Sequence, residues 1–323
     1  MTPTITLEEH FVSEAFTASA GPPPGIDLYD VATLQRKLRG VGDERIKDMD
    51  EAGVTFQVVS HNAAGDVSDA EVCRKSNDEL YRGVSKNPIR FAGFAMLPMA
   101  DATAATQELE RCIKALGFIG ALVCNHARGE FYDGKKYHKL FEKLQELDVP
   151  LYLHPTAPWK DTKAHYEGGY PKEIAFVLGG YGWGWHSDTG LHFLRLFASG
   201  LFDKFPKLKI VLGHNGEMVP FMLDRVSGFY ERTPDHERSL MTVWNENIWI
   251  TTSGMFTLTP FASLFRAAKI DRIMYSIDYP FEDNKDGQDF LRTLESSGLV
   301  TKEDMEKICY KNAEKLLKIK LIN

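Results

Sequence analysis

Short apolar runs alternate with amphipathic segments along the whole chain. Eight of the runs have the length of β-strands and are rich in Val, Ile, Phe and Tyr. They lie at residues 5–7, 54–60, 91–97, 119–124, 149–154, 209–214, 247–252 and 272–277. Most are too continuously apolar for a sheet with one face in water, which indicates strands that are covered on both faces.

Eight segments of helical periodicity separate or follow these runs. They are residues 43–52, 69–86, 104–116, 137–147, 189–199, 217–230, 260–268 and 302–317. Eight alternations of strand and helix predict right-handed crossovers and parallel strands that close into one α/β barrel domain, a (β/α)8 or TIM barrel, over residues 1–323. An open doubly wound sheet is the alternative, although no GxGxxG motif follows the first run.

Two stretches do not fit the repeat and predict irregular insertions at the C-terminal face of the barrel. Residues 11–39 contain SAGPPPG at 19–25, and consecutive prolines disfavour a regular helix. Residues 155–188 are rich in Gly, Trp and Tyr and include GGYGWGW at 179–185. The second stretch is either a functional lid or interface, or a packing loop stiffened by aromatic rings.

The composition is that of a chain with a large hydrophobic core, and it argues against several classes of protein. Hydrophobic residues make up 43% of the 323 positions, which argues against a disordered chain. The net charge of −7 does not favour a nucleic-acid-binding face.

The sequence has no apolar run of about 18 residues that would predict a membrane span, and residues 1–11 do not resemble a signal peptide. Widely spaced cysteines without a CxxC pair indicate reduced thiols and a cytoplasmic location; they are Cys73, Cys112, Cys124 and Cys309.

Polar residues with metal-binding or proton-transferring side chains end four of the apolar runs. In a parallel barrel these ends meet at one rim, where active sites lie. The first run ends in Glu8-Glu9-His10, and His154, His214 and Asp278 end three others.

Glu8 and His10 are two residues apart, so in an extended strand they point the same way, while Glu9 points toward the helices or a neighbouring loop. With His154 and Asp278 they would supply two imidazoles and two carboxylates, donors that suit one divalent ion, Zn²⁺ first and Mn²⁺ or Mg²⁺ as alternatives. Four ligands leave a coordination position open for substrate, as a catalytic metal requires. A surface Glu-x-His pair and a core histidine at 154 are the structural alternatives.

His214 lies in VLGHNGE, three residues before Glu217. It could be a metal ligand, a general base, or a donor to a substrate oxygen, with Glu217 orienting its other nitrogen; a polar strand end with a capping glutamate is the alternative. His61, after the second run, and His126, after the fourth, could line the pocket, whereas His186 and His192 are interpreted as packing residues.

Seven motifs give the chain a resemblance to a known family over nearly its whole length. They are LEEH (7–10), LGFIGALV (116–123), LDVPLYLHP (147–155), ASGLFDKFPKLKIVLGHNGE (198–217), ENIWITTSG (246–254), DRIMYSIDYPFE (271–282) and NAEKLLKI (312–319). The chain resembles the aromatic acid decarboxylases of the amidohydrolase superfamily, which act on γ-resorcylate, 2,3-dihydroxybenzoate, salicylate and 5-carboxyvanillate and belong with the aminocarboxymuconate semialdehyde decarboxylase group.

The resemblance implies a role for each candidate residue. Glu8, His10, His154 and Asp278 match the metal ligands, and His214 matches the active-site histidine with Glu217 as its partner. Arg225 resembles an arginine that reaches into a neighbouring subunit's pocket, which implies a homodimer or homotetramer. Candidate substrate contacts are Arg225, His61, Pro22, where the family has an aromatic residue, and Phe281.

The implied activity is metal-dependent, non-oxidative and reversible decarboxylation of an ortho-hydroxylated aromatic acid, without an organic cofactor. Asp278 would donate a proton to the ring carbon that bears the carboxylate, which requires its neutral form, and His214 would help to deprotonate or hold the phenol oxygen. One alternative is a metal-dependent hydrolase of a lactone or amide, although the chain has LEEH in place of His-x-His and no lysine at the end of the fourth run. The other is a non-catalytic binding barrel, whose signature would be a lost ligand.

Overall fold

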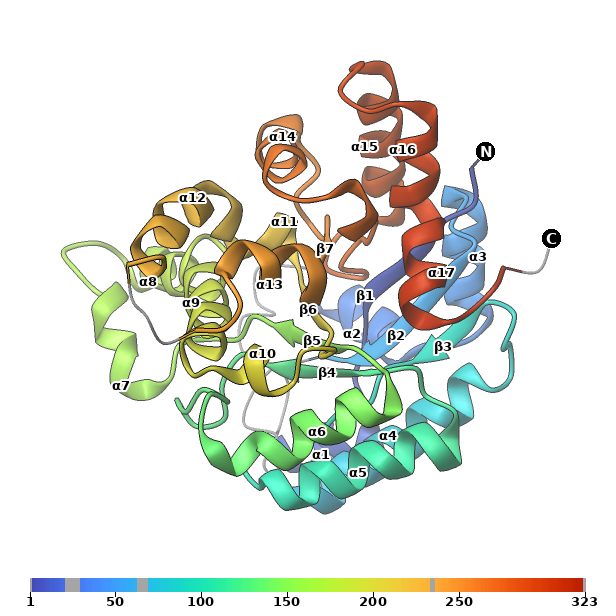
Figure 1. Cartoon of the computed structure of the whole chain (residues 1–323). Coiled ribbons are helices and arrows are strands. Elements are labelled where there is room, and N and C mark those ends of the chain that lie inside the picture. Colours follow the sequence, from blue (N-terminus) through green and yellow to red (C-terminus); the bar gives the residue numbers. More distant parts are fainter. Residues whose placement is uncertain (1, 21–29, 63–68, 233–235, 322–323) are drawn as a thin grey trace.

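A computed structural model describes residues 2–20, 30–62, 69–232 and 236–321 of the chain. Its parallel strands form a central barrel, and helices surround them (Figure 1). The strands are β1 (Ile5–Phe11), β2 (Phe56–His61), β3 (Phe91–Gly93), β4 (Ala121–Cys124), β5 (Leu151–His154), β6 (Ile210–Leu212), β7 (Ile248–Thr251) and β8 (Ile273–Met274). Each predicted apolar run therefore contains a strand, and the predicted barrel class is confirmed.

The helices are α1 (Glu14–Ala20), α2 (Val31–Arg39), α3 (Asp43–Ala52), α4 (Ala70–Val84), α5 (Ala102–Leu116), α6 (His138–Leu147), α7 (Lys160–Lys163), α8 (Lys172–Gly179), α9 (Gly184–Ala198), α10 (Leu201–Lys204), α11 (His214–Glu217), α12 (Val219–Tyr230), α13 (Leu240–Asn247), α14 (Leu258–Ala267), α15 (Asn284–Ser296), α16 (Lys302–Glu306) and α17 (Asn312–Leu317). A π-helical turn, Lys307–Lys311, separates the last two, so the predicted helix 302–317 is interrupted. No helix in the described ranges is long and apolar enough to cross a membrane.

The stretches expected to be irregular are partly helical. Residues 11–39 carry α1 and α2 on either side of residues 21–29. These nine residues, among them the predicted substrate contact Pro22, lie outside the described residues. Residues 155–188 carry α7, α8 and the first turn of α9. The glycine-rich segment at 179–185 therefore separates α8 from α9 and does not prevent helices in the rest of its stretch.

The strands pair in two parallel sheets, β1-β2-β3 and β4-β5-β6-β7-β8, and two narrow junctions join them. Between β3 and β4 a single bridge pairs Ala95 with Ala121. Between β8 and β1 the side chain of Ser276 replaces a ladder: its Oγ accepts from the amides of Leu7 (2.9 Å) and Glu8 (2.7 Å). The amide of His10 then donates to the carbonyl of Tyr279 at 2.6 Å.

Along each strand, side chains point alternately into the barrel and outward against the helices. One buried cluster contains Leu7, Val58, Tyr152, Val211 and Trp249. The neighbouring positions Val59, Leu153, Leu212 and Ile250 belong to the larger cluster that the surrounding helices cover. Strands buried on both faces explain why the apolar runs are continuous, and the inward phase of Tyr152 carries His154, two residues on, to the barrel mouth.

A buried histidine outside the barrel mouth should make the fold sensitive to acid. His192 on α9 is fully buried, its Nε2 accepts from the amide of Tyr132 at 3.0 Å, and burial lowers its pKa to about 3. Since the unfolded imidazole binds a proton below about pH 6.5, this contribution to stability is present above that pH and is lost as the pH falls toward 3. Between pH 7 and pH 5 the loss from this residue should be about 2 kcal/mol. Urea unfolding at both pH values should show a smaller difference for His192→Gln than for the wild type; equal differences would contradict the assignment.

Candidate metal and catalytic site

A β-bulge in β1 sets the direction of the first two candidate ligands. Thr6 pairs with Gln57 and Glu9 with Val59, so two residues of β1, Leu7 and Glu8, oppose one residue of β2, Val58. Leu7 points into the barrel with the interior cluster, and the bulge lets the next residue, Glu8, point inward as well. From there the alternation holds: His10 also faces the mouth, and Glu9 faces the segment after β8.

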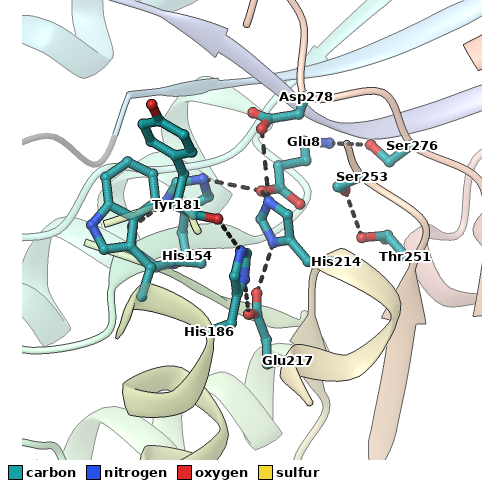
Figure 2. A network of polar contacts seen from close by, with 12 residues as sticks. Glu8, His154, Tyr181, His186, His214, Glu217, Thr251, Ser253, Ser276 and Asp278 are labelled. Carbon is teal, nitrogen blue, oxygen red and sulfur yellow. Dashed lines mark hydrogen bonds and ion pairs between the residues drawn. The ribbon is translucent and has the colours of Figure 1, made fainter. Parts of the chain in front are cut away.

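Glu8, His10, His154 and Asp278 meet at the mouth of the barrel. Their potential ligand atoms all lie within 4.8 Å of one another. His10 Nε2 is 2.8 Å from Asp278 Oδ1, and His154 Nε2 is 3.0 Å from Glu8 Oε1. Figure 2 shows three of these side chains, from β1, β5 and the segment after β8, converging from different directions.

The cluster fits a divalent metal ion. Within the described part of the chain, Glu8 Oε1, His10 Nε2 and Asp278 Oδ1 are buried but make no hydrogen bond of acceptable geometry. Buried polar atoms are nearly always hydrogen-bonded, so three such atoms that face one another indicate ligands. Two imidazoles and two carboxylates are donors suited to Zn²⁺ or Mn²⁺.

The surrounding side chains orient the candidate ligands. The Tyr152 hydroxyl donates to Glu8 Oε2, which turns Oε1 toward the cluster. The His154 Nδ1–H donates to the carbonyl of Pro155 at 2.7 Å, which leaves Nε2 facing the site. Gly213 permits this packing, since a Cβ there would lie 2.7 Å from Glu8 Oε2.

Glu9 holds the backbone on both sides of Asp278. Its carboxylate accepts from the amides of Ile277 and Tyr279, both at 3.1 Å, and from Ser276 Oγ at 3.0 Å. Asp278 itself has a left-handed φ of 77°, which costs energy in a non-glycine residue. Burial raises the pKa of Glu9 to about 8, although its hydrogen bonds oppose that shift. Glu9 faces a neighbouring loop, as predicted, and this loop is the one that presents Asp278.

His214 lies beside the cluster and is oriented by Glu217. Its Nδ1 is 2.8 Å from Glu217 Oε1, while its Nε2 faces Glu8 Oε1 at 3.6 Å and Asp278 Oδ2 at 3.7 Å (Figure 2). Burial lowers the pKa of His214, but the carboxylates of Glu8 and Glu217 outweigh burial and raise it well above its ordinary value. The predicted contact between His214 and Glu217 is therefore present, and the role of His214 stays a prediction.

The expected neutral form of Asp278 is not favoured in the free protein. Burial raises its pKa, but contacts with His10 and His214 outweigh burial and lower it below its ordinary value. An acid at this position must therefore gain its proton after the surroundings change, for example when an anionic substrate adds negative charge nearby.

Sequence reasoning missed His186, which it interpreted as a packing residue. Its Nδ1 is 2.7 Å from Glu217 Oε2, so Glu217 bridges His186 and His214. No local pattern indicates this contact, because the two residues are 31 positions apart and meet through the packing of α9.

The other predicted residues lie at varied distances from the cluster. The structure does not bring His61 into it: Nε2 of His61 accepts from the amide of Ser13 at 3.1 Å, and Nδ1 is 2.9 Å from the carbonyl of Asn62. Both ring nitrogens are thus occupied by main-chain groups, which leaves none for a substrate. The Phe281 ring packs edge-on against His10 with centroids 5.5 Å apart, whereas Arg225 is exposed on α12.

Comparisons with known proteins identify the family. A family model described as "Amidohydrolase" matches residues 35–319. "Decarboxylase orsB" of Emericella nidulans is 48% identical over 98% of this chain and 97% of its own, and the gamma-resorcylate decarboxylase of Polaromonas sp. is 37% identical over 98% of both. The crystal structure of the dihydroxybenzoic acid decarboxylase of Polaromonas sp. JS666, with bound manganese and the inhibitor 2-nitroresorcinol, has a TM-score of 0.88, 37% identity and coverage of 98% of this chain and 97% of that one.

The chain therefore belongs to the amidohydrolase family. Relatives of this chain are named as decarboxylases of hydroxybenzoates, which are carbon–carbon lyases, and this confirms the activity class inferred from the sequence.

Replacing Glu9 should separate support of the loop from metal binding. Glu9→Gln places an NH₂ group against a main-chain N–H, so the free energy of unfolding should fall by about 1–3 kcal/mol, and added Mn²⁺ should bind more weakly because the backbone around Asp278 is less fixed. Glu8→Gln is the matched control: it should lose metal without losing the β8–β1 junction. Denaturant unfolding and metal titration of both variants provide the measurements, and wild-type stability and affinity in Glu9→Gln would contradict the assignment.

Proposed function

We propose that this protein removes CO₂ from a small aromatic acid that carries a hydroxyl group ortho to its carboxylate. The observation that carries the proposal is the four-residue cluster Glu8, His10, His154 and Asp278 with the His214–Glu217 pair beside it. Relatives named as decarboxylases of γ-resorcylate support the substrate class, and one related structure holds 2,6-dihydroxybenzoate.

Glu8, His10, His154 and Asp278 would hold a single divalent ion, and no organic cofactor is required. When bound, this ion supplies positive charge that attracts the carboxylate and the ortho oxygen of the substrate and withdraws electron density from the ring. The sequence favoured Zn²⁺, whereas a relative's structure holds manganese, and the mixed nitrogen and oxygen donors accept either. Metal analysis of the purified protein distinguishes the two.

Asp278 is the proposed proton donor. It transfers a proton to the ring carbon that bears the carboxylate, the bond between that carbon and the carboxylate then breaks, and its electron pair restores the aromatic ring as CO₂ leaves. Because the pKa of Asp278 is low in the free protein, Asp278 must first take up a proton from solvent, which the negative charge of the bound substrate favours. The reaction is redox-neutral and reversible when bicarbonate is abundant.

His214 is proposed to hold the phenol oxygen of the substrate. Its Nε2 faces the cluster, and Glu217 fixes the ring by its contact with Nδ1 at 2.8 Å. A lactone or amide hydrolase would instead need these groups to activate water, so lactones serve as negative controls when hydroxybenzoates are assayed.

We further propose a homodimer or homotetramer in which α12 is part of the interface. Phe221, Met222 and Phe229 on this helix are 84%, 41% and 55% exposed, unusual values for large apolar side chains. Arg225 lies among them with its guanidinium 5.4 Å from the Phe229 ring centroid, where it could reach a neighbouring subunit's pocket. The proposed single domain would be the subunit of this assembly.

The proposed cytoplasmic location is in keeping with the state of the cysteines. Cys73, Cys112 and Cys309 are buried thiols.

Asp278→Asn should abolish decarboxylation of 2,6-dihydroxybenzoate. General acid catalysis contributes about 10²–10⁴-fold to a rate, so kcat should fall by at least that range. Substrate absorbance and CO₂ release measure the loss, and metal analysis separates it from loss of the ion. Asp283→Asn, at an exposed carboxylate five residues away, should keep the wild-type rate. Retained turnover in Asp278→Asn would remove Asp278 from the role.

Phe221→Glu should dissociate the assembly because it places a charge in the proposed apolar interface. Light scattering after size-exclusion chromatography should show the wild type as an oligomer and the variant as a smaller species. Ile89→Glu is the matched control, since Ile89 is 62% exposed but lies between α4 and β3. A monomeric wild type, or a Phe221→Glu variant of unchanged mass, would refute the interface.

A further inference from the structure

His186 connects the insertion at residues 155–188 to the catalytic histidine. It lies in the first turn of α9, where that insertion ends, and is 5% exposed. Its Nε2 is 3.0 Å from the carbonyl of Tyr181, and its Nδ1 is 2.7 Å from Glu217 Oε2. The other carboxylate oxygen of Glu217 contacts His214 Nδ1 at 2.8 Å, so one carboxylate joins two imidazoles (Figure 2).

The partners of His186 define where its hydrogens lie. A main-chain carbonyl only accepts, so Nε2 carries a hydrogen and donates to Tyr181. A carboxylate oxygen faces Nδ1 at 2.7 Å, a distance at which two lone pairs would repel, so a hydrogen also lies between Nδ1 and Glu217. Both hydrogen bonds of His186 are therefore made, and Glu217 is held from the side opposite His214.

The backbone packing around this contact is close. A Cβ at Gly190 would lie 2.4 Å from the carbonyl oxygen of Glu217, so α9 approaches the His214–Glu217 segment only because residue 190 is glycine. A Cβ at Gly184 would lie 2.4 Å from the carbonyl of Gly179, at the end of α8. The rings of His186 and His214 are themselves in contact, with centroids 4.7 Å apart.

We propose that His186 is a positioning residue for decarboxylation: through Glu217 it fixes the ring of His214, and it thereby makes the order of the 155–188 insertion a condition for catalysis. Glu217 alone has a rotatable carboxylate, and a second donor on its far oxygen removes that freedom. The His214 ring is then held with Nε2 toward the substrate. The insertion acts by supplying His186 and the Tyr181 carbonyl that orients it, which gives a role to a segment that the sequence left open between a lid and a packing loop.

Two isosteric variants test this, and the test of rate rests on the proposed function. An asparagine amide nitrogen is as many bonds from Cα as Nδ1, and a glutamine amide nitrogen as many as Nε2. His186→Asn therefore keeps a donor to Glu217 and loses the bond to Tyr181, whereas His186→Gln does the reverse. We expect His186→Gln to lower kcat about 10–100-fold, the usual effect of removing a partner that orients an active-site ligand. KM should change little, and His186→Asn should stay within about threefold of wild type.

His192→Gln removes another buried imidazole from α9 without touching Glu217, so it controls for packing and should keep the wild-type kcat. Metal content should be equal in all variants. Equal losses in the Asn and Gln variants, wild-type kcat in both, or an effect on KM alone would overturn the proposal. If the Gln variant does not fold, a folded His186→Asn variant whose kcat is reduced 10-fold or more would also overturn the proposal.

Crystal structures of the two variants give a readout that is independent of activity. The contact between His214 Nδ1 and Glu217 should remain at about 3 Å in His186→Asn, and the Glu217 carboxylate or the His214 ring should be displaced in His186→Gln. An unmoved pair in His186→Gln would refute the positioning role. A wild-type protein that decarboxylates no hydroxybenzoate would instead refute the proposed substrate class, and the structures would still decide the role of His186.

Discussion

The structure depends on bringing two carboxylates and two imidazoles together in a buried barrel mouth. Ionised side chains pay a large desolvation cost unless they are paired or bind a metal. Glu8 and His10 are fully buried, so their environment must supply opposite charge and directed partners. The Tyr152 hydroxyl on Glu8, the Pro155 carbonyl on His154 and the Glu9 side chain on the backbone around Asp278 are the directed partners. The neighbouring imidazoles supply the charge that stabilises ionised Glu8. The rest of the barrel holds these partners at fixed positions.

The side chains that support the candidate site from outside the cluster lie far along the chain from the residues that they hold. Glu9 belongs to β1 but holds the loop after β8, and His186 belongs to an insertion but holds Glu217 after β6. The β8–β1 junction is accordingly both the closure of the barrel and the support of Asp278. The insertion likewise completes the histidine–glutamate–histidine chain.

The sequence predicted features that depend on local pattern. Continuous apolar runs located the strands, and residues at the ends of these runs located the four side chains that meet at the barrel mouth. It did not predict features that depend on tertiary packing. The bulge in β1 is visible only in the pairing with β2, and the contact of His186 with Glu217 depends on how closely α9 approaches residue 217. His61 had the expected position after β2, but hydrogen bonds from the loop after β1 occupy it. The lowered pKa of Asp278 depends on contacts that no spacing reveals.

An anomalous-scattering map from crystals grown with manganese tests the central claim most directly. The account predicts one peak at the barrel mouth, about 2.0–2.3 Å from donor atoms of Glu8, His10, His154 and Asp278, with room left for a ligand. Crystals of the folded protein that show no such peak, or in which Glu8, His154 and Asp278 point away from one another, would contradict it.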